Sequence, residues 1–386
     1  MIAARLSPLQ YKNYSQIIIH TIMKKLSILL CLFLLSCSND KETIVVQYSD
    51  SSGVELLSSP IFESIEIVTL RGEGAPDLSP WAKMLVKNDT CYITGEAKIH
   101  LFDANGKYLN SVGERGRGPA EYLSLDDMII EDHGEISVYS NQSEALGVLY
   151  TYSPQGRFLR RTELPYKPLH FFKAEGFNYH YFGHGGSIGI MPYQLYITDN
   201  QNRLVDSCLT SSDVINLGIG TVFSPFGDAL NLCPAYGGEV YRLTGGRVQI
   251  IYTFHFGAFH LPELFYKKDY MESYEFIEST PLAFKIRFFE NPKYAVLLTW
   301  VVNPEQEWTR WNYGVLDKAT ATWKWYFMKE GDFMDDPCLS YMDDSYVYFT
   351  VDPIKIKESG LSERFPLLEA IDIYEDLLVI LKCKLK

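Results

Sequence analysis

The clearest pattern along the chain is an apolar strand, a polar turn and a second strand, repeated at intervals of about 50 residues. The copies cover residues 99–109, 149–159 and 195–205, with weaker copies at 241–248 and 314–323. Gly106, Gly156 and Asn202 stand at the same turn position, and both residue types tolerate positive φ. The pattern predicts a β-hairpin in each copy.

A period of roughly 40–50 residues made of strands and tight turns is typical of β-propeller blades, because a four-stranded sheet must stack on its neighbours to bury both faces. Aromatic residues, which favour pleated and half-buried surfaces, make up 14% of the chain. We therefore predict an all-β fold, a six-bladed β-propeller. Seven blades are the alternative, because residues 37–386 have room for either number at this period.

Two segments depart from the strand pattern. Residues 261–279 and 363–374 have apolar side chains near helical spacing, and we expect each to form a short helix inserted between blades. Trp323, Trp325 and Phe327 instead fall on one face of a strand, where we expect them to pack between neighbouring blades.

The N-terminal segment has the layout of a secretory signal. We interpret residues 1–22 as an extension upstream of the true start at Met23, and residues 23–36 as a signal peptide with two lysines before a ten-residue apolar run. That run is too short to span a bilayer as a helix. Its end, Leu34–Cys37, resembles a bacterial lipobox, which implies that the Cys37 thiol carries lipid. A plain signal peptide and a single membrane anchor are the alternatives.

Residues 37–50 are then the lipidated cysteine and a polar tether, and residues 51–386 the propeller domain. Residues 38–42 resemble the acidic tags of surface lipoproteins in Bacteroidetes. We therefore expect an outer-membrane lipoprotein that faces either the periplasm or the cell surface, with its lipid as the contact to the membrane.

Charge and cysteine content exclude several classes of partner. The net charge is −13, and it becomes −17 without residues 1–36, which carry four cations and no acid. No basic stripe remains for phosphates, so we expect no nucleic-acid partner. The cysteines beyond Cys37 are widely spaced and contain no Cys-x-x-Cys, which indicates small buried side chains rather than a zinc site.

The first repeat carries a family resemblance. Residues 99–109, followed by the glycine-rich loop 112–122, resemble the blade signature of the six-bladed β-propeller lipoproteins of Bacteroidetes, which are related in architecture to NHL-repeat propellers. Residues 65–70 and 377–386 are similar to the first and closing strands of that family. Ala120 replaces a glycine of its Gly-Pro-Gly-Glu-Tyr segment. The resemblance implies six blades, and it transfers no catalytic residue because the family has no agreed activity.

Motifs that suggest catalysis or metal binding lack the structural context that they require. Residues 185–189 match Gly-x-Ser-x-Gly, but a strand rather than a helix follows. His180 and His184 have no helix to place them on one face, and Asp103 starts a turn that lacks the other ligands of a calcium loop. Adjacent acids point to opposite faces of a strand, so we interpret the pairs at 126–127, 335–336 and 343–344 as turns. We predict no catalytic residue, metal or cofactor.

Two places carry candidate ligand contacts. Arg115, Arg117 and Tyr122 lie in the glycine-rich loop, where the two cations could meet an acidic ligand; the alternative is that the arginines anchor the loop through backbone carbonyls. Trp308 and Trp311 could stack on a sugar ring, and packing inside the propeller is the alternative.

These observations favour a non-enzymatic, lipid-anchored propeller that binds a ligand or a protein at its axial face. A glycan or an envelope protein is the expected partner. The alternatives are a glycan-active hydrolase or lyase built on the same fold, and a structural subunit of an envelope complex.

Overall fold

The computed structural model describes residues 43–386 except 49–55, 59, 132, 142–145, 185–190, 217–220, 307, 328–337, 359–368, 370 and 373–376. The chain divides into two compact units, Met1–Thr43 and Ile44–Lys386. The second unit contains all the strands and helices described below.

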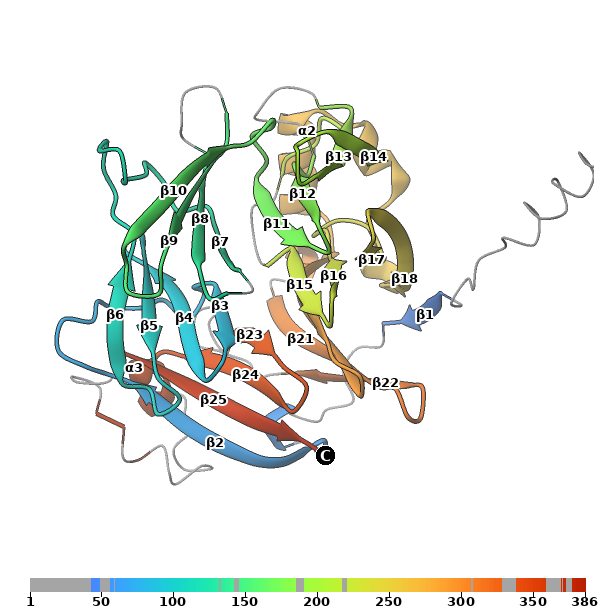
Figure 1. Ribbon diagram of the computed structural model, residues 1–386. Coiled ribbons are helices and arrows are strands. Elements are labelled where there is room, and N and C mark those ends of the chain that lie inside the picture. Colours follow the sequence, from blue (N-terminus) through green and yellow to red (C-terminus); the bar gives the residue numbers. More distant parts are fainter. Residues whose placement is uncertain are drawn as a thin grey trace, which may run out of the picture. The chain divides into compact units, whose positions relative to one another are not determined.

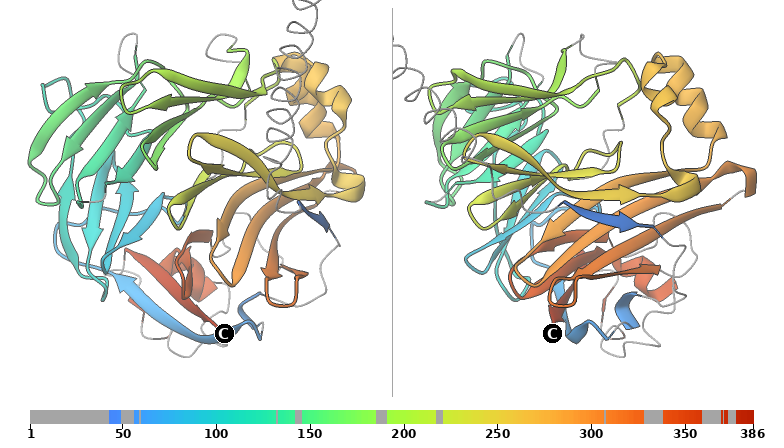
Figure 2. Two further views of the ribbon diagram at one scale, coloured as in Figure 1. Left: turned by 45° about the vertical axis from the view of Figure 1, so that its right-hand side comes forward. Right: turned by 90° about the vertical axis from the view of Figure 1, so that its right-hand side faces the viewer.

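Six antiparallel sheets follow one another along the second unit, and Figures 1 and 2 show them arranged around a common axis. Blade 1 consists of β3 (Met84–Lys87), β4 (Thr90–Gly95), β5 (Lys98–Phe102) and β6 (Tyr108–Val112). Blade 2 consists of β7 (Asp127–Ile130), β8 (Ile136–Ser140), β9 (Val148–Tyr152) and β10 (Phe158–Glu163). Blade 3 consists of β11 (His170–Ala174), β12 (Phe177–Tyr181), β13 (Tyr193–Asp199) and β14 (Leu204–Thr210).

The other three blades are built in the same order. Blade 4 consists of β15 (Phe223–Phe226), β16 (Ala229–Leu232), β17 (Glu239–Thr244) and β18 (Arg247–His255). Blade 5 consists of β19 (Leu282–Glu290), β20 (Tyr294–Asn303), β21 (Trp308–Asp317) and β22 (Thr322–Phe327). Blade 6 consists of β23 (Cys338–Met342), β24 (Tyr346–Val351), β25 (Leu378–Leu385) and β2 (Phe62–Leu70). The predicted six-bladed β-propeller is confirmed.

The first strand of each blade is the innermost one. Contacts between sheets therefore join first strands: β7 meets β11, β15 meets β19, β19 meets β23, and β23 meets β3. Apolar side chains fill the spaces between blades, as in the cluster that contains Tyr122, Ile136 and Tyr150 of blades 1 and 2. Closing the ring in this way places the edge formed by each first strand at the centre of the propeller, where the neighbouring blades protect it.

The repeat in the sequence corresponds to one hairpin of the blade. The five copies are the hairpins between the third and fourth strands of blades 1 to 5. Gly106, Gly156 and Asn202 have φ values of 81°, 82° and 60°, as their turn position requires. The Asp103 carboxylate accepts hydrogen bonds from the backbone N–H groups of Asn105 and Lys107, which confirms that this residue starts a turn.

The ring is closed by the two ends of the second unit. β2 pairs antiparallel with β25, so an N-terminal strand completes the last blade. These are the strands that resemble the first and closing strands of the lipoprotein family, and they lie side by side.

Residues 44–47, which the sequence analysis places in the tether, form β1 (Ile44–Gln47). β1 pairs parallel with β18 and adds a fifth strand to blade 4. The indole of Trp325 donates a hydrogen bond to the Gln47 carbonyl oxygen at 3.1 Å. Cys37 and the rest of residues 37–42 lie outside the described residues.

Short helices lie between the strands. The predicted helical insertion at 261–279 is confirmed as η3 (Glu263–Lys267) and α2 (Tyr270–Ser279), and Asp269 caps α2 by accepting from the Glu272 N–H. η2 (Gly257–Phe259) precedes them. The remaining helices are η1 (Leu56–Ser58), η4 (Pro304–Gln306) and α3 (Pro353–Glu358). The predicted helix at 363–374 falls almost wholly outside the described residues.

The tryptophans of β22 pack between blades, as predicted. Trp323 lies 5.7 Å from the ring of Tyr252 and 5.1 Å from that of Phe254, both on β18 of the preceding blade. Among the remaining cysteines, Cys208 is half-buried and the others are buried, and all five are free thiols: Cys91, Cys208, Cys233, Cys338 and Cys383.

Candidate functional site

The turns after the first strands surround one end of the propeller axis and form a cavity of about 770 Å³. A second cavity of about 750 Å³ shares Pro225, Gly227 and Tyr341 with the first, so the two are continuous. We call them together the axial groove. Its lining includes side chains from all six blades: Lys87, Glu131, Phe172, Asp228, Pro292 and Tyr341 represent blades 1 to 6 in order.

The groove has an apolar floor and an acidic rim. Leu85, Ile129 and Phe172 belong to the floor, which lies between the inner strands of blades 1, 2 and 3. The lining residues carry six carboxylates against two lysine ammonium groups: Glu131, Glu175, Asp228, Glu290, Asp343 and Asp344 against Lys87 and Lys173. The groove therefore favours a ligand that is neutral or cationic over one that is anionic.

Much of the rim is held by its own hydrogen bonds. Lys173 pairs with Glu131 at 3.1 Å, and the Lys87 ammonium donates to the Glu131 carbonyl oxygen at 2.9 Å. The Asp343 carboxylate accepts from the Ser345 and Tyr346 N–H groups and so fixes the turn of blade 6. These contacts preorganise the groove before a ligand arrives.

Asp228 and Asp344 differ from the other rim acids. Both residues are exposed. In the described part of the chain, no hydrogen bond or ion pair holds either carboxylate. They are therefore available to bind hydroxyl or ammonium groups of a ligand.

A charged cluster lies behind the floor of the groove, where the first strands of blades 1, 2 and 3 begin. The Lys83 ammonium is 5.9 Å from the centre of the Phe172 ring and forms an ion pair with Asp127. His170 Nδ1 lies 3.6 Å from the other Asp127 oxygen. Burial acts to raise the pKa of Asp127, but Lys83 and His170 outweigh it and lower the pKa to about 2. The cluster therefore joins three blades around an ionised carboxylate.

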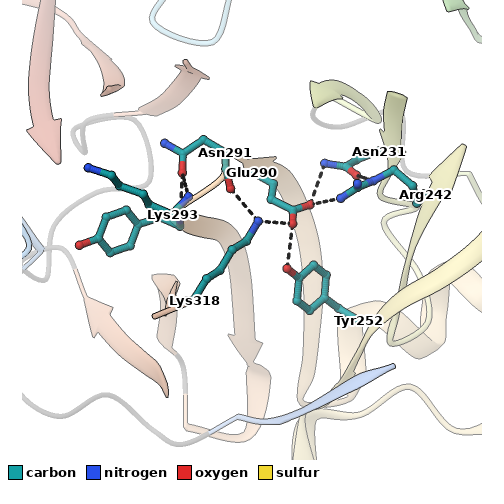
Figure 3. Close-up of polar contacts among 8 residues, drawn as sticks. Asn231, Arg242, Tyr252, Glu290, Asn291, Lys293 and Lys318 are labelled. Atoms are coloured by element: carbon teal, nitrogen blue, oxygen red, sulfur yellow. Dashed lines mark hydrogen bonds and ion pairs between the residues drawn. The ribbon is translucent and has the colours of Figure 1, made fainter. Parts of the chain in front are cut away.

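A second cluster joins blades 4 and 5 beside the groove (Figure 3). Glu290 accepts hydrogen bonds from the Tyr252 hydroxyl at 3.0 Å and the Lys318 ammonium at 2.5 Å, and it also pairs with Arg242. The Arg242 guanidinium and the Lys318 ammonium lie 3.9 and 4.8 Å from the centre of the Phe226 ring. These cation–π contacts fix a ring that lines the groove.

The predicted ligand loop lies at the opposite end of the inner strands. Arg115 lines a separate cavity of about 570 Å³ together with Trp81 and Glu96, while Arg117 is exposed and is not part of that lining. Tyr122, the third candidate contact in this loop, lies inside the propeller. Its ring is fully buried and its hydroxyl donates to the Ala97 carbonyl oxygen at 2.6 Å, so it supports the loop from beneath.

The two tryptophans that we considered for sugar stacking lie on β21. Trp308 is the first residue of that strand, opposite Asn303 of β20. Trp311 is 6% exposed and packs against Trp81 at 5.0 Å and Trp300 at 6.2 Å. Trp311 therefore follows the alternative that we gave for it, packing inside the propeller.

The histidine pair contains two separate, buried imidazoles. His180 Nε2 lies 3.1 Å from the Thr198 hydroxyl, and His184 Nδ1 lies 2.8 Å from the Ser212 hydroxyl. Burial lowers the pKa of His180 to about 3 and that of His184 to about 4, so both are neutral at pH 7. No group of three His, Cys, Asp or Glu residues suited to a metal occurs within the described ranges. Residues 185–189 and 335–336 lie outside them.

Binding at an axial face was expected from the sequence, but the residues that line the axial groove were not predicted as ligand contacts. The lining of the groove comes from the turns after the first strands, which lie outside the hairpin repeat that the sequence shows. The acid pair at 343–344 was noted as a turn, which is confirmed for Asp343, but only the fold brings it near Asp228.

The fold and the groove define the class of this protein: a six-bladed β-propeller with a ligand-sized groove at one end of its axis. The chain belongs to the family described as domain of unknown function DUF4934, which matches residues 41–371. No curated protein matches the chain.

A solved structure supports the fold. A Bacteroides fragilis protein described as a "Putative exported protein" has 16% sequence identity and a TM-score of 0.71, over 89% of this chain and 99% of that one. The BamB protein of Moraxella catarrhalis has 10% identity and a TM-score of 0.40, over 74% and 86% of the two chains. The Pan2 WD40 domain of Neurospora crassa has 10% identity and a TM-score of 0.37, over 74% and 78%. The last two similarities are too low to carry an argument.

Among the described residues, no helix combines the length and the apolar character needed to cross a membrane.

Proposed function

We propose that this protein is a lipid-anchored binding module of the bacterial outer membrane that holds its ligand in the axial groove. The convergence of all six blades on one groove carries the proposal, because a site of that kind exists only in the closed propeller. Its two cavities have the size of small-molecule sites, which measure roughly 300–1,000 Å³.

The chemistry of the groove narrows the class of ligand. Phe172 and the other floor residues suit an apolar body or the flat face of a sugar ring. Asp228, Asp344 and the further acids of the rim suit hydroxyl or amino groups. A neutral or amino-bearing oligosaccharide satisfies both requirements, whereas a polyanion does not.

The binding test uses the purified body after Cys37 and a panel of neutral, amino-bearing and acidic oligosaccharides, measured by isothermal titration calorimetry. Asp228→Asn with Asp344→Asn should weaken binding of the amino-bearing members at least tenfold. Asp77→Asn with Glu96→Gln, at the cavity on the opposite face, is the matched control and should leave binding unchanged. Equal loss in both double variants, or no binding by any member of the panel, would overturn the proposal.

The same panel tests the enzymatic alternative, a glycan hydrolase or lyase. Asp127 and His170 lie together at the axis, but the Asp127 oxygens also accept from Lys83 and from the N–H groups of Met128 and Phe171. This arrangement supports a structural role. Chromatography of the incubated oligosaccharides should show them intact, and shortened products would overturn the non-enzymatic assignment.

The anchor requires its own test. The lipobox-like sequence supports lipidation at Cys37, and the similar fold of a Bacteroides protein described as exported is compatible with it. Cys37→Ala should move the protein from the membrane fraction to the soluble fraction. If the variant stays with the membrane, the anchor is not a lipid on this residue.

A further inference from the structure

Arg287 is a buried cation on the first strand of blade 5. Its side chain is 2% exposed and reaches two neighbouring blades. Nη1 donates to the Leu339 carbonyl oxygen at 2.8 Å and the Ser340 hydroxyl at 3.2 Å, both on β23. Nη2 donates to the Trp81 carbonyl oxygen at 2.9 Å, ahead of β3. The guanidinium therefore joins blades 5, 6 and 1.

All of these acceptors are neutral. Within the described residues no carboxylate lies within 4.0 Å of the Arg287 guanidinium, and its Nε–H has no hydrogen-bond partner. The Ser340 hydroxyl also contacts the Thr350 hydroxyl at 2.5 Å, and Thr350 donates to the Pro80 carbonyl oxygen. Among the residues that the structure describes, the polar groups around Arg287 therefore supply no negative charge to balance it.

Other buried charges in the propeller are balanced or can be discharged. Asp127 pairs with Lys83, and Glu290 pairs with two cations. Lys285, two residues before Arg287, is also buried and donates only to carbonyl groups, but burial lowers the pKa of its ammonium group, whereas a guanidinium is not open to this adjustment. A guanidinium keeps its charge at any physiological pH, and a buried charge without a counter-ion is strongly unfavourable.

We propose that Arg287 binds a small monovalent anion of chloride size, which accepts from its Nε–H where blades 5, 6 and 1 meet. The Trp81 ring lies 5.5 Å from the guanidinium carbon and also lines the cavity of about 570 Å³. The Trp81 side chain therefore lies between the anion site and that cavity. It is separate from the axial groove and does not depend on the function proposed for it.

Thermal unfolding in sodium chloride and in sodium gluconate, at equal ionic strength, tests this site. At a chloride concentration of ten times its Kd, the Tm of the wild-type protein should be about 2 °C higher than the Tm in gluconate. Arg157→Met removes an exposed arginine from a blade 2 hairpin and should keep this increment. Arg287→Met should lose it. No increment in the wild type, or the same increment in both variants, overturns the proposal.

A second measurement needs only the wild-type protein, in case Arg287→Met fails to fold. Crystals soaked in sodium bromide should give an anomalous peak next to Arg287 Nε. Bromide peaks at other positions only, or none, would show that this side chain holds no anion.

Discussion

Replacing Asp127 with asparagine tests whether the Lys83–Asp127–His170 cluster stabilises the propeller through charge. The carboxylate is 4% exposed and its pKa falls from an ordinary 3.8 to about 2. Each tenfold change in proton affinity is worth about 1.4 kcal/mol, so the fall corresponds to roughly 2.5 kcal/mol of stability. Breaking a buried pair costs about 3–5 kcal/mol, and the 17% exposure of Lys83 favours the lower end. We expect Asp127→Asn to lower the free energy of unfolding by about 3 kcal/mol at pH 7.

The pH dependence distinguishes this charge effect from a packing effect. Because the folded pKa lies below the unfolded one, the stability from the charge is present above about pH 4 and is lost as the pH falls towards 2. Urea unfolding followed by tryptophan fluorescence at pH 7, 5 and 3 measures it. Wild type and Asp127→Asn should differ most at pH 7 and less at pH 3.

The matched control is Asp103→Asn, in an exposed turn that asparagine can cap equally well, with an expected change within about 0.5 kcal/mol. A gap between wild type and Asp127→Asn that stays constant from pH 7 to 3 would refute the charge argument. An equal loss in Asp103→Asn would refute the importance of burial.

Three further predictions concern stability and reactivity. Glu290→Gln leaves two half-buried cations without their carboxylate. Urea unfolding should show that the free energy of unfolding falls by about 2–4 kcal/mol. A change close to zero would contradict a stabilising role of the network. Gly106→Ala should lower the free energy of unfolding by at least ~3 kcal/mol, because a Cβ would lie 2.2 Å from a carbonyl oxygen of β2. Gly156→Ala has φ of 82° but its nearest atom is 3.4 Å away, so it should lower the free energy of unfolding by only ~1 kcal/mol. Equal losses in the two variants would contradict the role of the close contact. Burial raises the pKa of Cys91 to about 12 and that of Cys208 to about 11. Ellman's reagent at pH 8 should therefore react slowly with the folded protein and quickly once urea is added. A rapid reaction of the folded protein would contradict the burial of these thiols.

The outer hairpins could be predicted because their signal is local. Asp103 accepts from N–H groups two and four residues ahead, and Gly106 takes the positive φ that the same turn needs. A turn of this kind depends on a few adjacent residues, so it can be predicted from the sequence of each repeat. Tyr122 was a candidate ligand contact, and its burial could not be predicted because it depends on Ile136 and Tyr150 of the next blade, which the loop sequence does not contain.

By itself, the sequence determined the blade unit, its number of repeats to within one, and the acidic character of the protein, because alternation, turn residues and charge are properties of short segments or of composition. Only the tertiary structure decided the axial groove and the buried charge clusters. Lys83 and Asp127 are 44 residues apart, and Arg242 and Glu290 are 48 apart. The partner that each charged side chain meets is decided when the ring closes, because closure brings together residues of different blades, including one turn from each blade around the groove.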